Sequence, residues 1–137
     1  MPILLENKKA GLNYEMLEEF EAGIELFGFE VKALRAKHGS LLGSYVTIRA
    51  GEAFLVGANV PPYQVGNTPK GYEPVRARRL LLTRRELLEL SGKLANAGLT
   101  LIPLLIYNKG PNLKLKLALA KGKKKHDKRA TIRKREA

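Results

Sequence analysis

The side chains in this sequence with the clearest chemical potential are cationic, and they gather at the C-terminal end. Nine of the last 17 residues are Lys or Arg and two are acidic, so residues 121–137 carry +7 of the net charge of +12. Such a segment binds polyanions, because each phosphate that it neutralises releases a condensed counterion. It has too few apolar residues to offset the entropy cost of ordering, so we expect a disordered tail in the free protein.

A second group of cations precedes a predicted helix. Its members are Arg76, Arg78, Arg79, Arg84 and Arg85. Guanidinium groups bind phosphate well, and the free backbone N–H groups of a helix start add to the attraction. We therefore predict that Arg76, Arg78 and Arg79 contact RNA. The alternative is an ordinary solvated surface.

Glu21 is the carboxylate with the most specific possible role. In an RNA site it would accept hydrogen bonds from base amino groups, which adds selectivity rather than affinity. The alternative is a plain carboxylate on the solvent face of a strand.

Other kinds of chemistry find little support. The chain has no Cys, and His38 and His126 are its only histidines. No acidic cluster has metal-ligand spacing, no base accompanies a nucleophile, and a phosphate-binding Gly-x-x-x-x-Gly-Lys motif is absent. We expect no enzyme, no cofactor and no metal.

Several strands are needed to position these residues. Residues 19–26 alternate between apolar and mostly acidic side chains, and residues 113–120 alternate between Leu and Lys or Ala, as half-buried strands do. Pro103 interrupts an apolar run and predicts an edge or a bulge, because proline has no N–H to donate. The expected strands are residues 19–26, 44–49, 52–56, 79–82, 99–107 and 113–120.

Two helices are expected beside them. Residues 28–37 form a short one. Thr83 and Glu86 have capping-box spacing, and the helix that they start should continue to Gly98 at the C′ position. Its apolar face contains Leu87, Leu90, Leu94 and Ala97.

Short strands with two to three helices favour a mostly β fold with flanking helices, namely a small antiparallel barrel. The OB type is a common oligonucleotide binder among such folds. We divide the chain into an RNA-binding barrel, residues 1–120, and a basic tail, residues 121–137. No apolar run is long enough to span a membrane, and residues 1–6 are too short for a signal peptide, so we expect a cytoplasmic protein that does not bind membranes.

Blocks of sequence spread from residue 7 to the C-terminus resemble the SsrA-binding protein family, also called small protein B (SmpB). They are Asn7–Ala10, Phe20–Ile24, Gly28–Arg35, Ser44–Val46, Gly51–Leu55, Arg79–Leu82 and Gly122–Arg129. Their joint order along nearly the whole chain carries the resemblance.

The resemblance implies a bacterial protein whose OB-like barrel binds the tRNA-like domain of transfer-messenger RNA (tmRNA). It also implies delivery of that RNA to stalled ribosomes for trans-translation, with the tail in the vacant mRNA channel near the decoding region of the small subunit. The partners are therefore this RNA and the ribosome, and DNA is not one. A general OB-type RNA-binding or ribosomal protein is the alternative.

The resemblance also assigns residues to two surfaces. The RNA-facing surface would include Asn7, Lys8, Glu21, Arg35 and Leu81, although Leu81 could equally be a core residue. The ribosome-facing tail would include Lys123, Lys124, His126, Asp127, Lys128 and Arg129.

Overall fold

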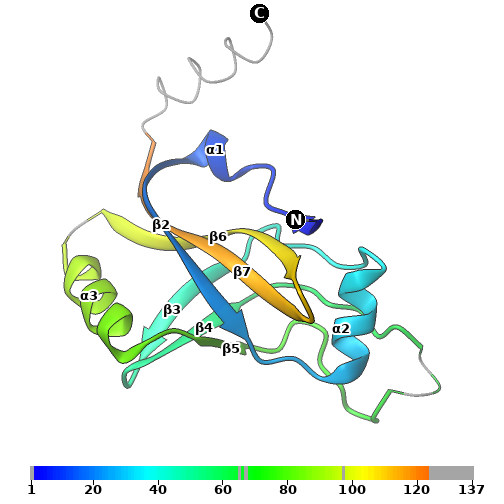
Figure 1. Ribbon diagram of the computed structural model, residues 1–137. Helices are drawn as coiled ribbons and strands as arrows, with labels where there is room; N and C mark the ends of the chain where they lie inside the picture. Colours follow the sequence, from blue (N-terminus) through cyan, green and yellow to red (C-terminus); the bar gives the residue numbers. More distant parts are fainter. Residues whose placement is uncertain (1, 65, 67, 97, 124–137) are drawn as a thin grey trace, which may run out of the picture.

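The structure, a computed structural model, describes residues 2–64, 66, 68–96 and 98–123 of the chain. Figure 1 shows strands that wrap around a common centre, with helices outside them. The elements are β1 (Ile3–Glu6), α1 (Ala10–Asn13), β2 (Tyr14–Ile24), α2 (Gly28–Arg35), β3 (Tyr45–Arg49), β4 (Glu52–Val56), β5 (Arg78–Leu81), α3 (Arg84–Leu94), β6 (Leu99–Lys109) and β7 (Asn112–Gly122).

The strands form a closed antiparallel ring. β6, β3, β4, β5, β2 and β7 pair in that order, and β7 pairs again with β6. β3 pairs with β6 at Leu101. β1 pairs with the later part of β6, with Glu6 opposite Leu105. Closing the sheet removes most of its exposed edges. The predicted OB-like fold, mostly β with flanking helices, is confirmed.

The core lies inside this ring. Alternate leucines of β7 point into it, and Leu115 and Leu117 are fully buried. α2 contributes Leu34 and α3 contributes Leu90, both fully buried, from opposite sides of the strands (Figure 1). Burying each such side chain stabilises the fold by about 1.5–3 kcal/mol, so the alternating leucines contribute substantially to the stability of the ring.

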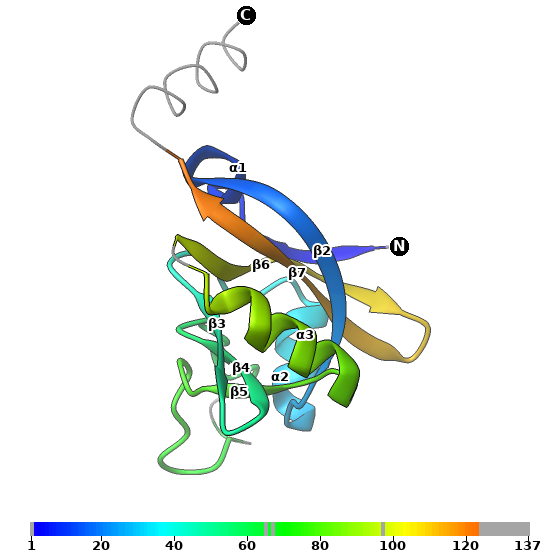
Figure 2. The ribbon, with the colours of Figure 1, turned by 90° about the vertical axis from the view of Figure 1, so that its left-hand side faces the viewer.

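Turns and caps follow the sequence closely. The β3–β4 hairpin turns at Ala50 and Gly51, which both have positive φ, as a type I′ turn requires. The β6–β7 register shifts between Pro103 and Leu105, so the predicted bulge is confirmed. Figure 2 shows α3 on the near side of the molecule, lying across the strands. Its Thr83 hydroxyl accepts the Glu86 N–H at 3.1 Å, which confirms the capping box.

The main differences concern the ends of elements. β1, α1 and the first half of β2 were not predicted. Register shifts at residues 3–5 and 16–18 break the period-two pattern of the two strands. α1 has only four residues, which is too short to show a helical period. α3 ends at Leu94, so Gly98 lies beyond its C′ position. β7 continues to Gly122, so the first two residues assigned to the tail belong to the sheet. Within the described part of the chain, no helix is long and apolar enough to cross a membrane.

Candidate nucleic-acid interface

Asn7 and Lys8 lie just after β1, beside the bulge of β6. The Asn7 side-chain amide donates to the Pro103 carbonyl at 2.9 Å, and its backbone N–H donates to the Leu104 carbonyl at 2.8 Å. These bonds fix the segment, and the adjoining Lys8 side chain is exposed. Two neighbouring hollows share Asn7 and Lys9 in their walls, and one of them extends to Tyr45. Asn7 can therefore present its amide, and Lys8 its charge, beside a concave surface.

Glu21 lies on the outer face of β2, three strands away from β1 across the sheet. Its carboxylate accepts a hydrogen bond from the Tyr107 hydroxyl and another from the Lys109 ammonium, the latter at 2.9 Å. The hydrogen bond from Tyr107, followed by that from Lys109, holds the pKa of Glu21 below its ordinary value. Glu21 is therefore an ionised acceptor held from one side.

Arg35 and Leu81 lie near the β6–β7 turn. The Arg35 guanidinium donates to the Pro111 carbonyl at 3.0 Å. Leu81 is 48% exposed, so the alternative of a core residue is wrong. Gly23 of β2 pairs with Leu81. A Cβ at Gly23 would approach the Leu81 Cβ to 3.2 Å, so the glycine lets this side chain lie against β2.

A hollow lies beside the β6–β7 turn. Leu81, Pro111 and Lys114 line it, together with Ile24 and Val31. Lys114 also acts electrostatically on Glu21. Leu81 and Lys114 thus line one hollow, and Arg35 lies beside it through its hydrogen bond to Pro111. Glu21 does not line the hollow but lies two residues before Gly23, which does. The two hollows beside Asn7 and Lys8 are separate from this one.

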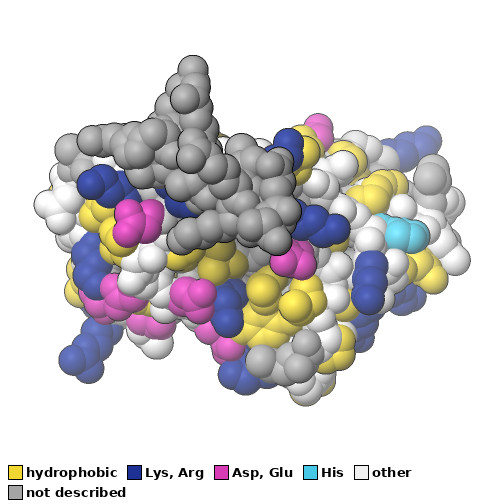
Figure 3. All heavy atoms as spheres, turned by 90° about the horizontal axis from the view of Figure 1, so that it is seen from above, with side chains coloured by type: hydrophobic (Ala, Val, Ile, Leu, Met, Phe, Trp, Pro, Cys, Tyr) yellow, Lys and Arg dark blue, Asp and Glu magenta, His cyan; other side chains and the backbone are white. Residues whose placement is uncertain are grey.

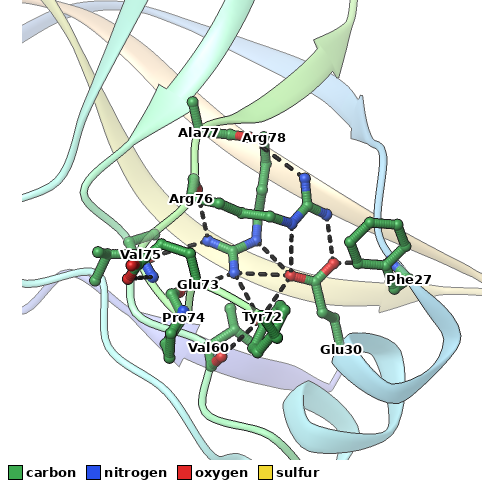
Figure 4. A network of polar contacts seen from close by, with 11 residues as sticks. Phe27, Glu30, Val60, Tyr72, Glu73, Pro74, Val75, Arg76, Ala77 and Arg78 are labelled. Atoms are coloured by element: carbon green, nitrogen blue, oxygen red, sulfur yellow. Dashed lines mark hydrogen bonds and ion pairs between the residues drawn. The ribbon is translucent and has the colours of Figure 1, made fainter. Parts of the chain in front are cut away.

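Arg78 corrects the sequence prediction. Its side chain is fully buried and so cannot reach RNA in this structure. The guanidinium donates to the Glu30 carboxylate at 2.7 and 2.9 Å, to the Ala58 and Pro74 carbonyls and to the Tyr72 hydroxyl (Figure 4). A buried charge needs a paired and hydrogen-bonded environment, and Arg78 has one. We therefore assign Arg78 a role in stabilising the fold.

Arg76 shares the same carboxylate. It forms an ion pair with Glu30 at 2.5 Å, and its guanidinium lies 4.3 Å above the ring centroid of Phe27. Its side chain keeps 26% exposure, so only an edge remains available to RNA. Burial alone would raise the pKa of Glu30, but hydrogen bonds from Arg76, the Phe27 N–H, Arg78 and Tyr72 outweigh it and lower that pKa.

Arg79 points out of the ring, unlike its neighbour. Its side chain is 45% exposed and pairs with Glu25 at 3.5 Å and Glu52 at 3.2 Å. Exposed pairs of this length are weak, so phosphate can compete for the guanidinium. β5 therefore presents one of its two arginines to the surface.

The predicted tail residues fall almost entirely outside the described part of the chain: Lys124, His126, Asp127, Lys128 and Arg129. Lys123 is described. Its ammonium donates to the Gly11 carbonyl at 2.6 Å and its backbone N–H to the Asn13 carbonyl at 3.0 Å. The chain thus leaves β7 against α1. Among the described residues, no three carboxylate or histidine side chains gather closely enough to hold a metal ion.

Sequence reasoning missed Tyr107, Lys109 and Lys114 as neighbours of Glu21. The sequence could have shown that residues 107 and 109 share one face of their strand, by the period-two rule. What could not be read was the register that sets β2 beside β7 and β7 beside β6.

Figure 3 shows acidic side chains gathered mainly on one side of the face seen from above, with Lys and Arg side chains among and around them.

The comparisons with known proteins agree with one another. A family model described as SmpB protein matches residues 4–137. The SsrA-binding protein of Thermosipho africanus is 48% identical over 99% of this chain and 91% of its own length. The SsrA-binding protein of Mesoplasma florum is 44% identical over 98% of this chain and 90% of its own length.

A solved structure is also similar. It is described as "tmRNA-SmpB: a journey to the center of the bacterial ribosome", with a TM-score of 0.73 and 41% identity. The match covers 97% of this chain and 96% of the other. Fold and sequence therefore lead to the same result: the chain belongs to the SmpB family.

Proposed function

We propose that this protein binds the tRNA-like domain of transfer-messenger RNA and delivers it to stalled ribosomes for trans-translation. The observation that carries the proposal is family membership over nearly the whole chain, including the match to a chain of a tmRNA–SmpB complex. The protein acts as an RNA-binding factor and not as an enzyme, and it acts in the cytoplasm.

Selective RNA binding belongs to the folded domain. The hollow at the β6–β7 turn offers a nucleobase an apolar wall with Leu81, while Arg35 and Lys114 lie within reach of phosphate. Glu21 adds an ionised acceptor for base amino groups. Asn7, Lys8, Arg79 and the exposed edge of Arg76 complete the proposed RNA-facing residues.

Ribosome engagement belongs to the basic tail. Its cationic residues suit a channel lined by RNA phosphates, where counterion release favours binding. Lys123 anchors the start of this segment to α1, so the tail leaves the fold at a defined place. The residues that we assign to ribosome contact are Lys123, Lys124, His126, Asp127, Lys128 and Arg129.

A reconstituted translation reaction stalled at the end of an mRNA tests this division. The full chain should support addition of the tmRNA-encoded peptide. A chain shortened after Lys123 should keep selective tmRNA binding and lose tagging. If the full chain gave no tagging with tmRNA from the same organism, the proposed function would be wrong. If the shortened chain lost selective RNA binding, the division of labour would be wrong.

A further inference from the structure

Glu21 reaches across β7 to two donors on β6. In the sheet, Glu21 lies opposite Lys116 of β7, and Tyr107 of β6 lies opposite Lys114 of β7. The Tyr107 hydroxyl donates to Oε2 and the Lys109 ammonium donates to Oε1. Both oxygens of one surface carboxylate are thus held from the same strand.

The two donors differ in rigidity. Tyr107 is 2% exposed, so packing fixes its ring and hence the position of its hydroxyl. A buried tyrosine hydroxyl also needs a hydrogen-bond partner, and Glu21 supplies one. The Lys109 side chain is 53% exposed and flexible by comparison. The tyrosine is therefore the part of this arrangement that defines the geometry.

This arrangement leaves the carboxylate able to accept more hydrogen bonds. A carboxylate oxygen has two lone pairs, and each Glu21 oxygen accepts one of these two bonds from the described residues. The Glu21 side chain keeps 37% exposure. An acceptor that is already oriented avoids the entropy cost of ordering a glutamate side chain when RNA binds.

We propose that Tyr107 is a positioning residue for RNA recognition, holding the Glu21 carboxylate so that its exposed lone pairs accept hydrogen bonds from base N–H groups. The inference rests on the proposed function, because it takes Glu21 as an RNA contact. Tyr107 itself acts through Glu21, since its hydroxyl is committed to that carboxylate.

Tyr107→Phe in the full chain tests the role without changing the charge. We expect affinity for tmRNA to fall about five- to tenfold and affinity for an unrelated RNA of equal length to stay unchanged. The slope of log affinity against log salt should also stay unchanged, because no phosphate contact is lost. The pKa of Glu21, followed by NMR, should rise toward its ordinary value. Tyr63→Phe removes a hydroxyl from an exposed loop residue and is the matched control.

A double-mutant cycle separates positioning from a general effect on the fold. In a Glu21→Ala background, Tyr107→Phe should cause no further loss of tmRNA affinity. An equal loss in both backgrounds, or an equal loss for both RNAs, would overturn the proposed role. So would unchanged tmRNA affinity in Tyr107→Phe while the wild-type chain discriminates between the RNAs. A wild-type chain that does not discriminate would instead refute the proposed function on which the inference rests.

Discussion

Two adjacent arginines on β5 offer a sharp test of how this fold is held together. Arg78 is fully buried and Arg79 is 45% exposed, although both pair with glutamates. We compare Arg78→Met with Arg79→Met, because methionine keeps much of the side-chain volume and removes the charge in both.

The magnitudes follow from burial. Arg78→Met removes the pair with Glu30 and leaves the Ala58 and Pro74 carbonyls without this donor. Breaking a buried pair by removing one partner costs about 3–5 kcal/mol, and the lower end of this range applies because Arg76 stays paired with Glu30. Arg79→Met removes two exposed pairs, which together contribute about 1 kcal/mol or less. The stability of a domain is about 5–15 kcal/mol, so only the first change approaches the limit of folding.

Urea unfolding followed by circular dichroism measures both variants. With an m-value of about 2 kcal/mol/M, Arg78→Met should lower the midpoint by about 1.5 M, and Arg79→Met by about 0.5 M or less. Equal small shifts for the two single variants would refute the reasoning that burial sets the value of these pairs.

Three further predictions concern other parts of the molecule. The folded-state pKa of Glu30 lies below the ordinary value of 4.5, so its contribution to stability is present above pH 4.5 and is lost as the pH falls through the folded-state pKa. Unfolding free energy measured between pH 6 and pH 3 should therefore depend less on pH in Glu30→Gln than in the wild-type chain, and an equal dependence would contradict this assignment. Thr83→Ala should lower the unfolding free energy by about 1 kcal/mol by removing the α3 cap, and a urea midpoint identical to that of the wild type would exclude a stabilising role for the cap. Glu21→Ala should reduce tmRNA affinity more than affinity for an unrelated RNA, and a constant ratio of the two in competition binding would identify Glu21 as a plain surface carboxylate.

Local sequence patterns predicted the local structure well. The alternating leucines of residues 113–119 predicted the inward face of β7, and the spacing of Thr83 and Glu86 predicted the start of α3. These features depend on residues that are close in the chain, so periodicity and capping rules can predict them. The first half of β2 was not predicted, because the register shift between Met16 and Glu18 moves the inward-facing positions to the other face of the strand.

Long-range placement was the part that sequence could not supply. Arg78 and Arg79 look alike in the sequence, yet one is enclosed by α2 and the loop before β5, and the other faces solvent. The partner of Arg78 is Glu30, 48 residues away, which only the closed ring brings near. The Tyr107–Glu21 contact spans 86 residues and depends on strand register in the same way.

The central claim is that the folded domain recognises tmRNA selectively. The most direct measurement is equilibrium binding of the full chain to tmRNA and to an unrelated RNA of equal length, over a series of salt concentrations. Both affinities should fall with salt, because the chain carries +12, but the tmRNA should remain more tightly bound throughout. Equal affinities at moderate salt would contradict the account and would indicate a general RNA-binding protein.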